Sequence, residues 1–205
     1  MKTTNYIITA FFLFVIGCNL VLFVSGKSHE NDDDLTSREY FLDDVSINVV
    51  VAEPDALIRI HTFEANTVAI HYPVNEREPE KFYRVSNDTL YVSRMILENH
   101  ESRRVDLYTK NITSVVAKSN SDIRITSFFS DNLEISAEQA RIEINNASLE
   151  EMVIHAIHSN ISMYSIHKLT YVFAKLENES ALRTDSKNIS KIDVEKDQSS
   201  RYNAY

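Results

Sequence analysis

Apolar residues recur about every 19 positions through the C-terminal half of the chain, and this period limits the available folds more than any other feature. Self-similarity at a fixed period near 20 residues is typical of solenoids, because each repeat buries its apolar face only against its neighbours. Five columns keep the same phase: Val116, Ile135, Ile154, Phe173 and Ile192; Ile123, Ile142 and Ile161; Ile125, Ile144, Met163 and Leu182; Leu133, Met152 and Tyr171; Phe128, Ala147 and Ile166. The chain is therefore predicted to be a repeat protein.

Each repeat has the pattern of a strand, a polar corner and a second strand. Alternation predicts that Ile142 and Ile144 point inward and that Arg141 and Glu143 point outward. Turns of roughly 17 to 20 residues are typical of a parallel β-solenoid, in which equivalent residues lie about 4.8 Å apart. We predict an all-β fold of this kind, with repeat rungs over 105–195. An antiparallel β-sandwich is the competing architecture, but it gives no reason for a constant phase.

The inward positions of the columns define an expected structural core. The chain has a single cysteine, Cys18, so the core must be stabilised by packing and backbone ladders rather than by disulfides. The expected core residues are Val116, Ile123, Ile125, Leu133, Ile135, Ile142, Ile144, Met152, Ile154, Ile161, Met163 and Phe173.

The N-terminal part divides into a leader, a spacer and a group of short strands. Residues 6–24 are mostly apolar and would reach about 28 Å as one hydrophobic helix, close to the thickness of a bilayer core. We expect 1–26 to be a membrane anchor or signal peptide and 27–39 a polar spacer. The β-solenoid domain then covers 40–200, opened by a strand meander over 40–93, and 196–205 form a polar tail.

Three fates of the leader are open. It can be retained as a membrane helix, it can be cleaved near the small residues of 24–26, or Cys18 can be lipidated in a lipoprotein-type motif. Lys2 precedes the apolar run and acidic residues follow it, which favours an orientation with the body outside the cytoplasm. We expect a membrane-anchored envelope protein, or a secreted one if the leader is removed.

Composition argues against several classes of function. The formal net charge of −9 is opposite in sign to the basic footprint of a nucleic-acid-binding protein. Both glycines, Gly17 and Gly26, lie in the leader, so neither a phosphate-binding loop nor a nucleophile elbow can form in the body. We expect no nucleotide, no cofactor and no catalytic residue.

Metal and carboxylate constellations are also weak. His155, His158 and His167 are the nearest approach to a metal site, and solvated strand histidines explain them better. Acidic side chains that could serve a polysaccharide-cleaving enzyme do not form a column at the repeat spacing: Glu134, Glu143, Glu150 and Glu151. We therefore predict no metal site.

Asparagines are expected to take the corners, because the body has no glycine for positions with positive φ. The candidates are Asn120, Asn132, Asn145, Asn146, Asn160, Asn178 and Asn188. An alternative role is open for those in N-x-[S/T] form, which are glycan acceptors in a eukaryotic secretory pathway: Asn87, Asn111, Asn146, Asn160, Asn178 and Asn188.

Two stretches resemble a known family. Residues 87–93 (NDTLYVS), followed by 105–108 (VDLY) and 111–123 (NITSVVAKSNSDI), look like the auto-transporter adhesin head domain, also called the head GIN domain. The resemblance covers about 40–200, although this chain lacks the glycines that punctuate typical members. It implies an exported, Bacteroidetes-type protein with a leader, an opening strand meander and a right-handed β-solenoid, and it transfers no catalytic residues.

These observations favour a non-enzymatic interaction, adhesion or structural module with an unidentified protein or glycan partner. A glycan-binding envelope protein is the second hypothesis, and a polysaccharide-cleaving enzyme is the third. Sugar binding needs exposed aromatic platforms. The chain has no Trp, so the candidates are Tyr83, Tyr91, Tyr108, Tyr164 and Tyr171, of which the period predicts that Tyr171 points inward.

Overall fold

The computed structural model describes residues 35–42, 45–73, 77, 82–96 and 102–205. The chain divides into two compact units, 1–36 and 37–205. The second unit is an all-β solenoid of about 5 turns, and the described residues contain no helix. Accordingly, no described segment is a helix suited to crossing a membrane. The leader predicted at 6–24 lies outside the described residues.

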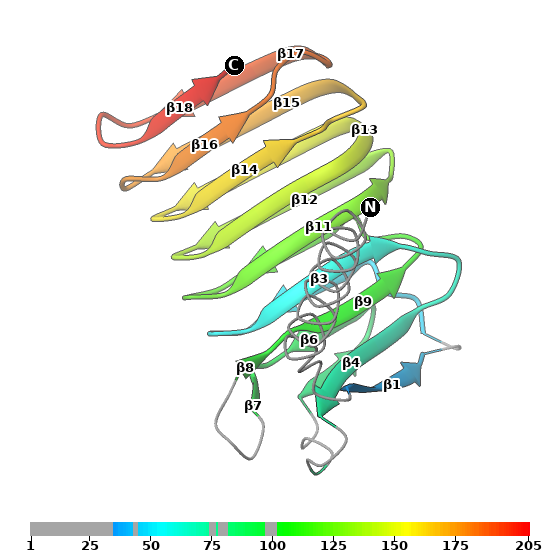
Figure 1. Ribbon diagram of the computed structural model, residues 1–205. Helices are drawn as coiled ribbons and strands as arrows, with labels where there is room; N and C mark the ends of the chain where they lie inside the picture. Colours follow the sequence, from blue (N-terminus) through cyan, green and yellow to red (C-terminus); the bar gives the residue numbers. More distant parts are fainter. Residues whose placement is uncertain (1–34, 43–44, 74–76, 78–81, 97–101) are drawn as a thin grey trace, which may run out of the picture. The chain divides into compact units, whose positions relative to one another are not determined.

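The solenoid carries two parallel sheets, which share strand β13 (Figure 1). We name each sheet's outward side after one strand. The β15 face belongs to β2 (Val49–Ala52), β10 (Ser114–Ala117), β12 (Asn132–Glu138), the second half of β13 (Arg141–Ile157), β15 (Lys168–Glu177) and β17 (Ile189–Lys196). The β14 face belongs to β3 (Leu57–Thr62), β11 (Asp122–Phe129), the first half of β13, β14 (Asn160–Tyr164), β16 (Ala181–Thr184) and β18 (Arg201–Ala204).

Antiparallel strands close one end of the stack. Strands β6 (Thr89–Val92) and β9 (Val105–Thr109) add parallel to β2 and β3. Then β5 (Tyr83–Ser86) pairs antiparallel with β6, and β4 (Thr67–Pro73) pairs antiparallel with β9. Strand β1 (Leu35–Phe41) follows β4, while β7 (Met95–Ile96) and β8 (Ser102–Arg103) form a separate ribbon.

The order of rungs differs from the order of the sequence. Residues 49–62, expected in an opening meander, form a parallel rung between the β6/β9 rung and the β10/β11 rung. Alternation alone could not reveal this, because a strand has the same period of two in a meander and in a solenoid. The regular stack therefore begins earlier in the chain than predicted.

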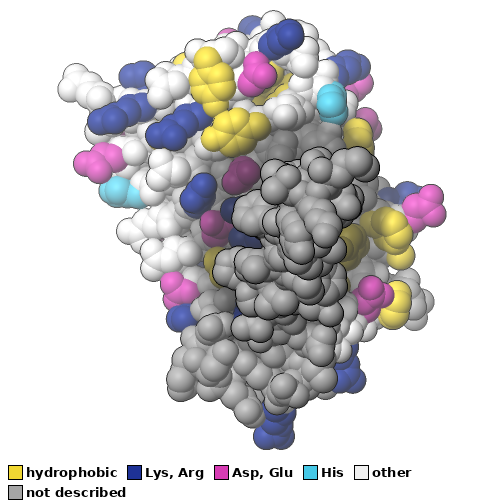
Figure 2. Space-filling model, viewed as in Figure 1, with side chains coloured by type: hydrophobic (Ala, Val, Ile, Leu, Met, Phe, Trp, Pro, Cys, Tyr) yellow, Lys and Arg dark blue, Asp and Glu magenta, His cyan; other side chains and the backbone are white. Residues whose placement is uncertain are grey.

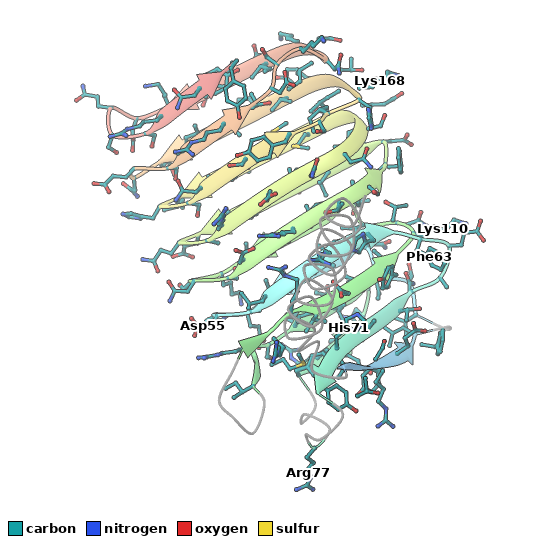
Figure 3. All side chains as sticks on the ribbon, in the orientation of Figure 1. Asp55, Phe63, His71, Arg77, Lys110 and Lys168 are labelled. Atoms are coloured by element: carbon teal, nitrogen blue, oxygen red, sulfur yellow. The ribbon has the colours of Figure 1, made fainter. Side chains whose placement is uncertain are left out.

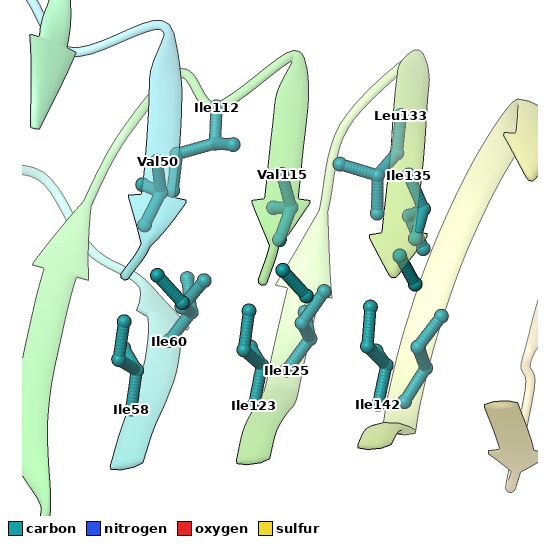
Figure 4. Packing of buried hydrophobic residues seen from close by; sticks show 14 of the residues in the cluster. Val50, Ile58, Ile60, Ile112, Val115, Ile123, Ile125, Leu133, Ile135 and Ile142 are labelled. Carbon is teal, nitrogen blue, oxygen red and sulfur yellow. The ribbon is translucent and has the colours of Figure 1, made fainter. Parts of the chain in front are cut away.

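Stacked aliphatic side chains form a continuous core. Figure 4 shows Ile58, Ile123 and Ile142 side by side on successive strands, with Val50, Val115 and Ile135 in the row that faces them. All of these side chains are fully buried. Each buried aliphatic side chain contributes about 1.5–3 kcal/mol relative to exposure, so these columns hold the turns together.

Ten of the twelve expected core residues are buried: Ile123, Ile125, Leu133, Ile135, Ile142, Ile144, Met152, Ile154, Ile161 and Met163. Val116 and Phe173 are corrections, since both are half-buried on the outer side while Val115 and Ala174 take the inward positions. Tyr171 also lies outward. The reason is turn length: β10 pairs with β12, and β13 with β15, at a separation of 20 residues, and one extra residue reverses a strand's facing.

Non-glycine residues with positive φ turn the corners. One corner stacks Asn120 (φ 59°), Gln139 (φ 51°), His158 (φ 49°) and Asn178 (φ 54°). The next corner stacks Ser127, Asn146 and Ser165. Of the predicted corner asparagines, Asn132, Asn145, Asn160 and Asn188 are not among the residues with positive φ.

Serines line the first corner from within. Ser159 is buried; its Oγ accepts from the backbone N–H of Ala140 at 3.1 Å and donates to the carbonyl of Ile157 at 2.8 Å. The Oγ of Ser180 accepts in the same way from the N–H of Ser159 at 3.1 Å. This ladder satisfies buried backbone donors where the strands stop pairing.

Candidate functional site

The two faces carry opposite charge. On the β15 face, outward strand positions are mostly acidic: Glu134, Glu138, Glu151, Glu177, Asp193 and Glu195, against Lys168, Lys175 and Lys191. On the β14 face, from β13 to β18, outward positions hold Arg141, Arg183 and Arg201 against one acid, Glu143. In a chain of net charge −9, this concentration of arginine distinguishes one surface from the rest.

A hollow lies among these arginines. Strand pairing aligns Arg141, Asn160, Ala181 and Arg201 in one column, and it places Ser162 beside Arg183 in the next. We call these six residues the arginine hollow. It consists of two adjoining depressions of about 290 and 410 Å³ that share Asn160, Ala181 and Arg183. The short side chains of Ala181 and Ser162 leave space between the long ones.

Among the described residues, two of the three arginines have no ion-pair partner. Arg141 lies 4.0 Å from the Glu143 carboxylate, which also lies 3.7 Å from Arg124. Within the described residues, neither Arg183 nor Arg201 has a carboxylate within salt-bridge distance. Figure 2 shows dark blue Lys and Arg side chains over β14, β16 and β18, in the upper part of the view.

One tyrosine borders the hollow, and a second tyrosine lies beside it. Tyr164 contributes to its wall, is half-buried and points outward from β14. Tyr205 is 65% exposed, and burial of its hydroxyl, followed by the neighbouring Tyr164, raises its pKa. The site therefore combines three guanidinium groups, amide and hydroxyl groups and an aromatic edge, with one carboxylate, Glu179, lining its second depression.

The β15 face presents a different set of side chains. Tyr171 donates a hydrogen bond to Asp193 at 3.1 Å, and the Lys191 ammonium lies 2.7 Å from the same carboxylate. That hydrogen bond raises the pKa of Tyr171, and the Lys191 contact lowers the pKa of Asp193. Phe173 meets His155 edge to face at 6.4 Å. Lys175 and Lys191 are thus both paired with carboxylates of this face, at 2.9 Å from Glu177 and 2.7 Å from Asp193.

Outward tyrosines occur at the closed end as well. The guanidinium of Arg84 lies 3.6 Å from the ring centroid of Tyr91. Tyr108 stacks on His61 at 5.1 Å with an interplanar angle of 16°. Tyr83, by contrast, is partly buried against the core. Of the five candidate tyrosines, four therefore face outward.

A buried carboxylate lies in the closed end. The side chain of Asp106 is only 8% exposed, and its oxygens lie 3.8 Å from Arg59 and 3.4 Å from the imidazole of His71. Figure 3 shows His71 on β4, toward the opposite end of the strands from Phe63 and Lys110. Burial lowers the pKa of the neighbouring His61. Because Arg59 lies beside the Asp106 carboxylate, the buried charge has a partner within the protein. We therefore interpret this cluster as a structural feature of the closed end.

The predicted histidines do not meet. His155 is exposed on the β15 face, His158 takes a corner, and His167 contacts the Asn146 side chain. Among the described residues, no three His, Cys, Asp or Glu side chains are grouped to hold a metal ion. The arginine hollow could not be predicted from the sequence. Its members are separated by 19 to 21 residues, so they align only once the length of each turn is known.

Comparison with known proteins identifies a shared fold and no family. No protein-family model matches the sequence, and no curated protein matches it at a significant level. Among solved structures, a protein named a "putative adhesin" from Bacteroides fragilis aligns with a TM-score of 0.53 and 11% identity, over 85% of this chain and 98% of that one. A "putative adhesin" from Parabacteroides merdae aligns with a TM-score of 0.39 and 9% identity, over 85% and 97%. The chain therefore shares the fold of the Bacteroides fragilis protein.

Proposed function

We propose that this protein is a non-enzymatic β-solenoid that acts outside the cytoplasm as an interaction or adhesion module. The observation that carries the proposal is the pair of long outer faces, which display ordered columns of polar, charged and aromatic side chains around a mainly apolar core. A solenoid surface of this kind suits extended partners. The Bacteroides fragilis structure, named a "putative adhesin", supports the same assignment.

The proposal includes a location and a family. Residues 6–24 tether the body to a membrane, or they direct its secretion, and the body faces away from the cytoplasm. The resemblance of 87–123 to head GIN domains and the Bacteroidetes origin of the structural neighbours support membership of that family and a right-handed coil.

Cysteine labelling tests the location. Ser136 is exposed on the β15 face and its neighbour Ala137 is 2% exposed, so Ser136→Cys and Ala137→Cys form a matched pair. A thiol reagent that cannot cross membranes should label the Ser136→Cys protein in intact cells and leave the Ala137→Cys protein unlabelled. Labelling of Ser136→Cys only after lysis would place the body in the cytoplasm and overturn the proposal.

Alkaline carbonate extraction tests the leader. We expect the full chain to remain with the membrane pellet, because about 28 Å of apolar helix can cross the bilayer core. N-terminal sequencing of the mature protein should then find Met1 or Lys2. A soluble product that begins near Lys27 would instead show a cleaved signal, and a blocked, lipid-bearing Cys18 would show a lipoprotein.

Glycan binding is the second candidate function. The arginine hollow favours it, because Asn160, Ser162 and Tyr164 provide amide, hydroxyl and aromatic groups at one place on a strand surface. Such groups can satisfy sugar hydroxyls and cover a sugar ring.

A further inference from the structure

We infer that the arginine hollow binds a segment of an acidic polysaccharide, with Arg183 and Arg201 pairing with its carboxylate or sulfate groups. The inference rests on the proposed function and names the ligand class for one face of the module.

Charge is the first argument. Guanidinium groups present a planar fork of donors that fits a carboxylate or sulfate with two parallel hydrogen bonds. Arg183 and Arg201 are exposed, lie on neighbouring strands and have no acidic partner among the described residues. In a chain of net charge −9, these two neighbouring guanidinium groups form a local concentration of positive charge that attracts an external anion.

Spacing is the second argument. Arg141 and Arg201 occupy one column, separated by Asn160 and Ala181, so three strand spacings of about 4.8 Å place them about 14 Å apart. One strand spacing is close to the length of one pyranose unit along an extended chain. A polysaccharide laid across the strands would therefore present successive units to successive rungs.

The floor of the hollow is the third argument. Asn160 and Ser162 offer donors and acceptors, and Ala181 leaves room for a ring to approach the sheet. On the last strand, the Asn203 amide continues this polar lining, and the Glu179 carboxylate and Ser199 line the corner side of the same depression. Sugar hydroxyls need such mixed groups, whereas a lipid head group needs an apolar rim that can enter the bilayer.

Isothermal titration calorimetry of the full-length protein with hexagalacturonate and with a sulfated dextran fragment tests the inference. The two probes distinguish carboxylate from sulfate as the preferred anion, and cellohexaose serves as the neutral control. We expect heat and saturation with an acidic probe, weakening as salt is added, and none with cellohexaose. Failure of both acidic probes to bind would overturn the inference and leave the cysteine-labelling result untouched.

Matched variants locate the binding. Arg183→Gln with Arg201→Gln should weaken the affinity by about tenfold or more, since a charge-assisted hydrogen bond contributes more than the 1.4 kcal/mol that equals a factor of ten. Lys175→Gln with Lys191→Gln removes the same charge from the β15 face and should change the affinity by less than about twofold. If both double variants weakened the affinity equally, the attraction would be diffuse, and the arginine hollow would not be a specific binding site.

A third variant tests shape apart from charge. Ala181→Ile fills the floor, keeps every charge and retains a side chain that suits a strand. We expect it to abolish binding of the hexamer while the thermal midpoint stays within a few degrees of the wild type. Unchanged binding by Ala181→Ile, or tighter binding to phosphatidylglycerol vesicles than to either acidic glycan, would contradict the polysaccharide assignment.

Discussion

At the scale of single residues, the corners depart most from ordinary backbone geometry. His158 and Gln139 have φ near 50° without being glycine or asparagine, and such residues lose about 1–2 kcal/mol in the left-handed region. Stacking compensates for this, because the N–H of Gln139 bonds to Ile157 and that of His158 bonds to Glu177, one turn further along.

Glycine at position 158 should stabilise the protein. His158→Gly relieves the left-handed conformation, offset in part by glycine's backbone entropy, for a net gain of about 0.5 kcal/mol in the free energy of unfolding. His155→Gly is the matched control, because it places glycine within β13 and should lose about 0.5–1 kcal/mol. Urea unfolding of both variants measures the difference, and two losses of equal size would show that the corner is unstrained.

Asp197 should make the last corner sensitive to acid. The backbone N–H of Asn178 donates to its carboxylate at 2.6 Å and that of Ser200 at 2.8 Å, which holds the pKa of Asp197 well below its ordinary value of 3.8. A carboxyl with a lowered pKa in the fold contributes stability above its unfolded pKa and loses it as the pH falls. We expect Asp197→Asn to lower the thermal midpoint at pH 6 and to differ less from the wild type below about pH 3.5. A constant difference across this range would exclude the carboxylate as the cause.

At the scale of elements, β13 links the two sheets. Its first half contacts β11 and β14, its second half contacts β12 and β15, and Asn146, with φ 57°, lies at the bend between them. Buried and outward positions alternate along each half.

Alanine substitutions within β13 should distinguish buried from outward positions by the stability that each one loses. Ile144 is fully buried, so Ile144→Ala should cost about 2–4 kcal/mol through the cavity it leaves. Glu143→Ala removes an outward neighbour with loose ion pairs and should stay within about 0.5 kcal/mol. Chemical denaturation of the two variants provides the comparison, and similar losses would contradict the facing of the strand.

The elements also show which parts of the fold follow from sequence. The 19-residue period predicted the parallel stacking of β12, β13 and β14, where the turn length is constant. It failed at Val116 and Phe173, where a turn of 20 residues changes the facing. The placement of β2 and β3 inside the stack depends on long-range pairing with β6 and β9, which leaves no local pattern. The arginine hollow was not predicted for a related reason: turns of unequal length bring its residues together, and a constant period cannot align them.

At the scale of the whole molecule, stability rests on apolar columns and on backbone pairing between rungs. Removal of metal ions should therefore leave the thermal midpoint unchanged, because the described residues offer no grouped ligands. Differential scanning fluorimetry with a chelator, and then with added calcium or zinc, checks this. A ligand at about 100 times its dissociation constant would contribute about 2.7 kcal/mol, so a true metal site would shift the midpoint by several degrees.

The two ends of the described stack are closed in different ways, and this gives the solenoid a mechanical direction. Strands β17 and β18 each pair on one side only, with β15 and β16, whereas β2 and β3 are held on both sides. A force applied to the last rung would have to break only one row of backbone hydrogen bonds per strand. The rungs would therefore detach one after another from that end. The β2/β3 rung would release late, because it is paired with two neighbouring rungs, both from later in the chain, and both pairings must break. Under tension from a bound partner, the module would yield gradually from its C-terminal rung and keep its closed end intact.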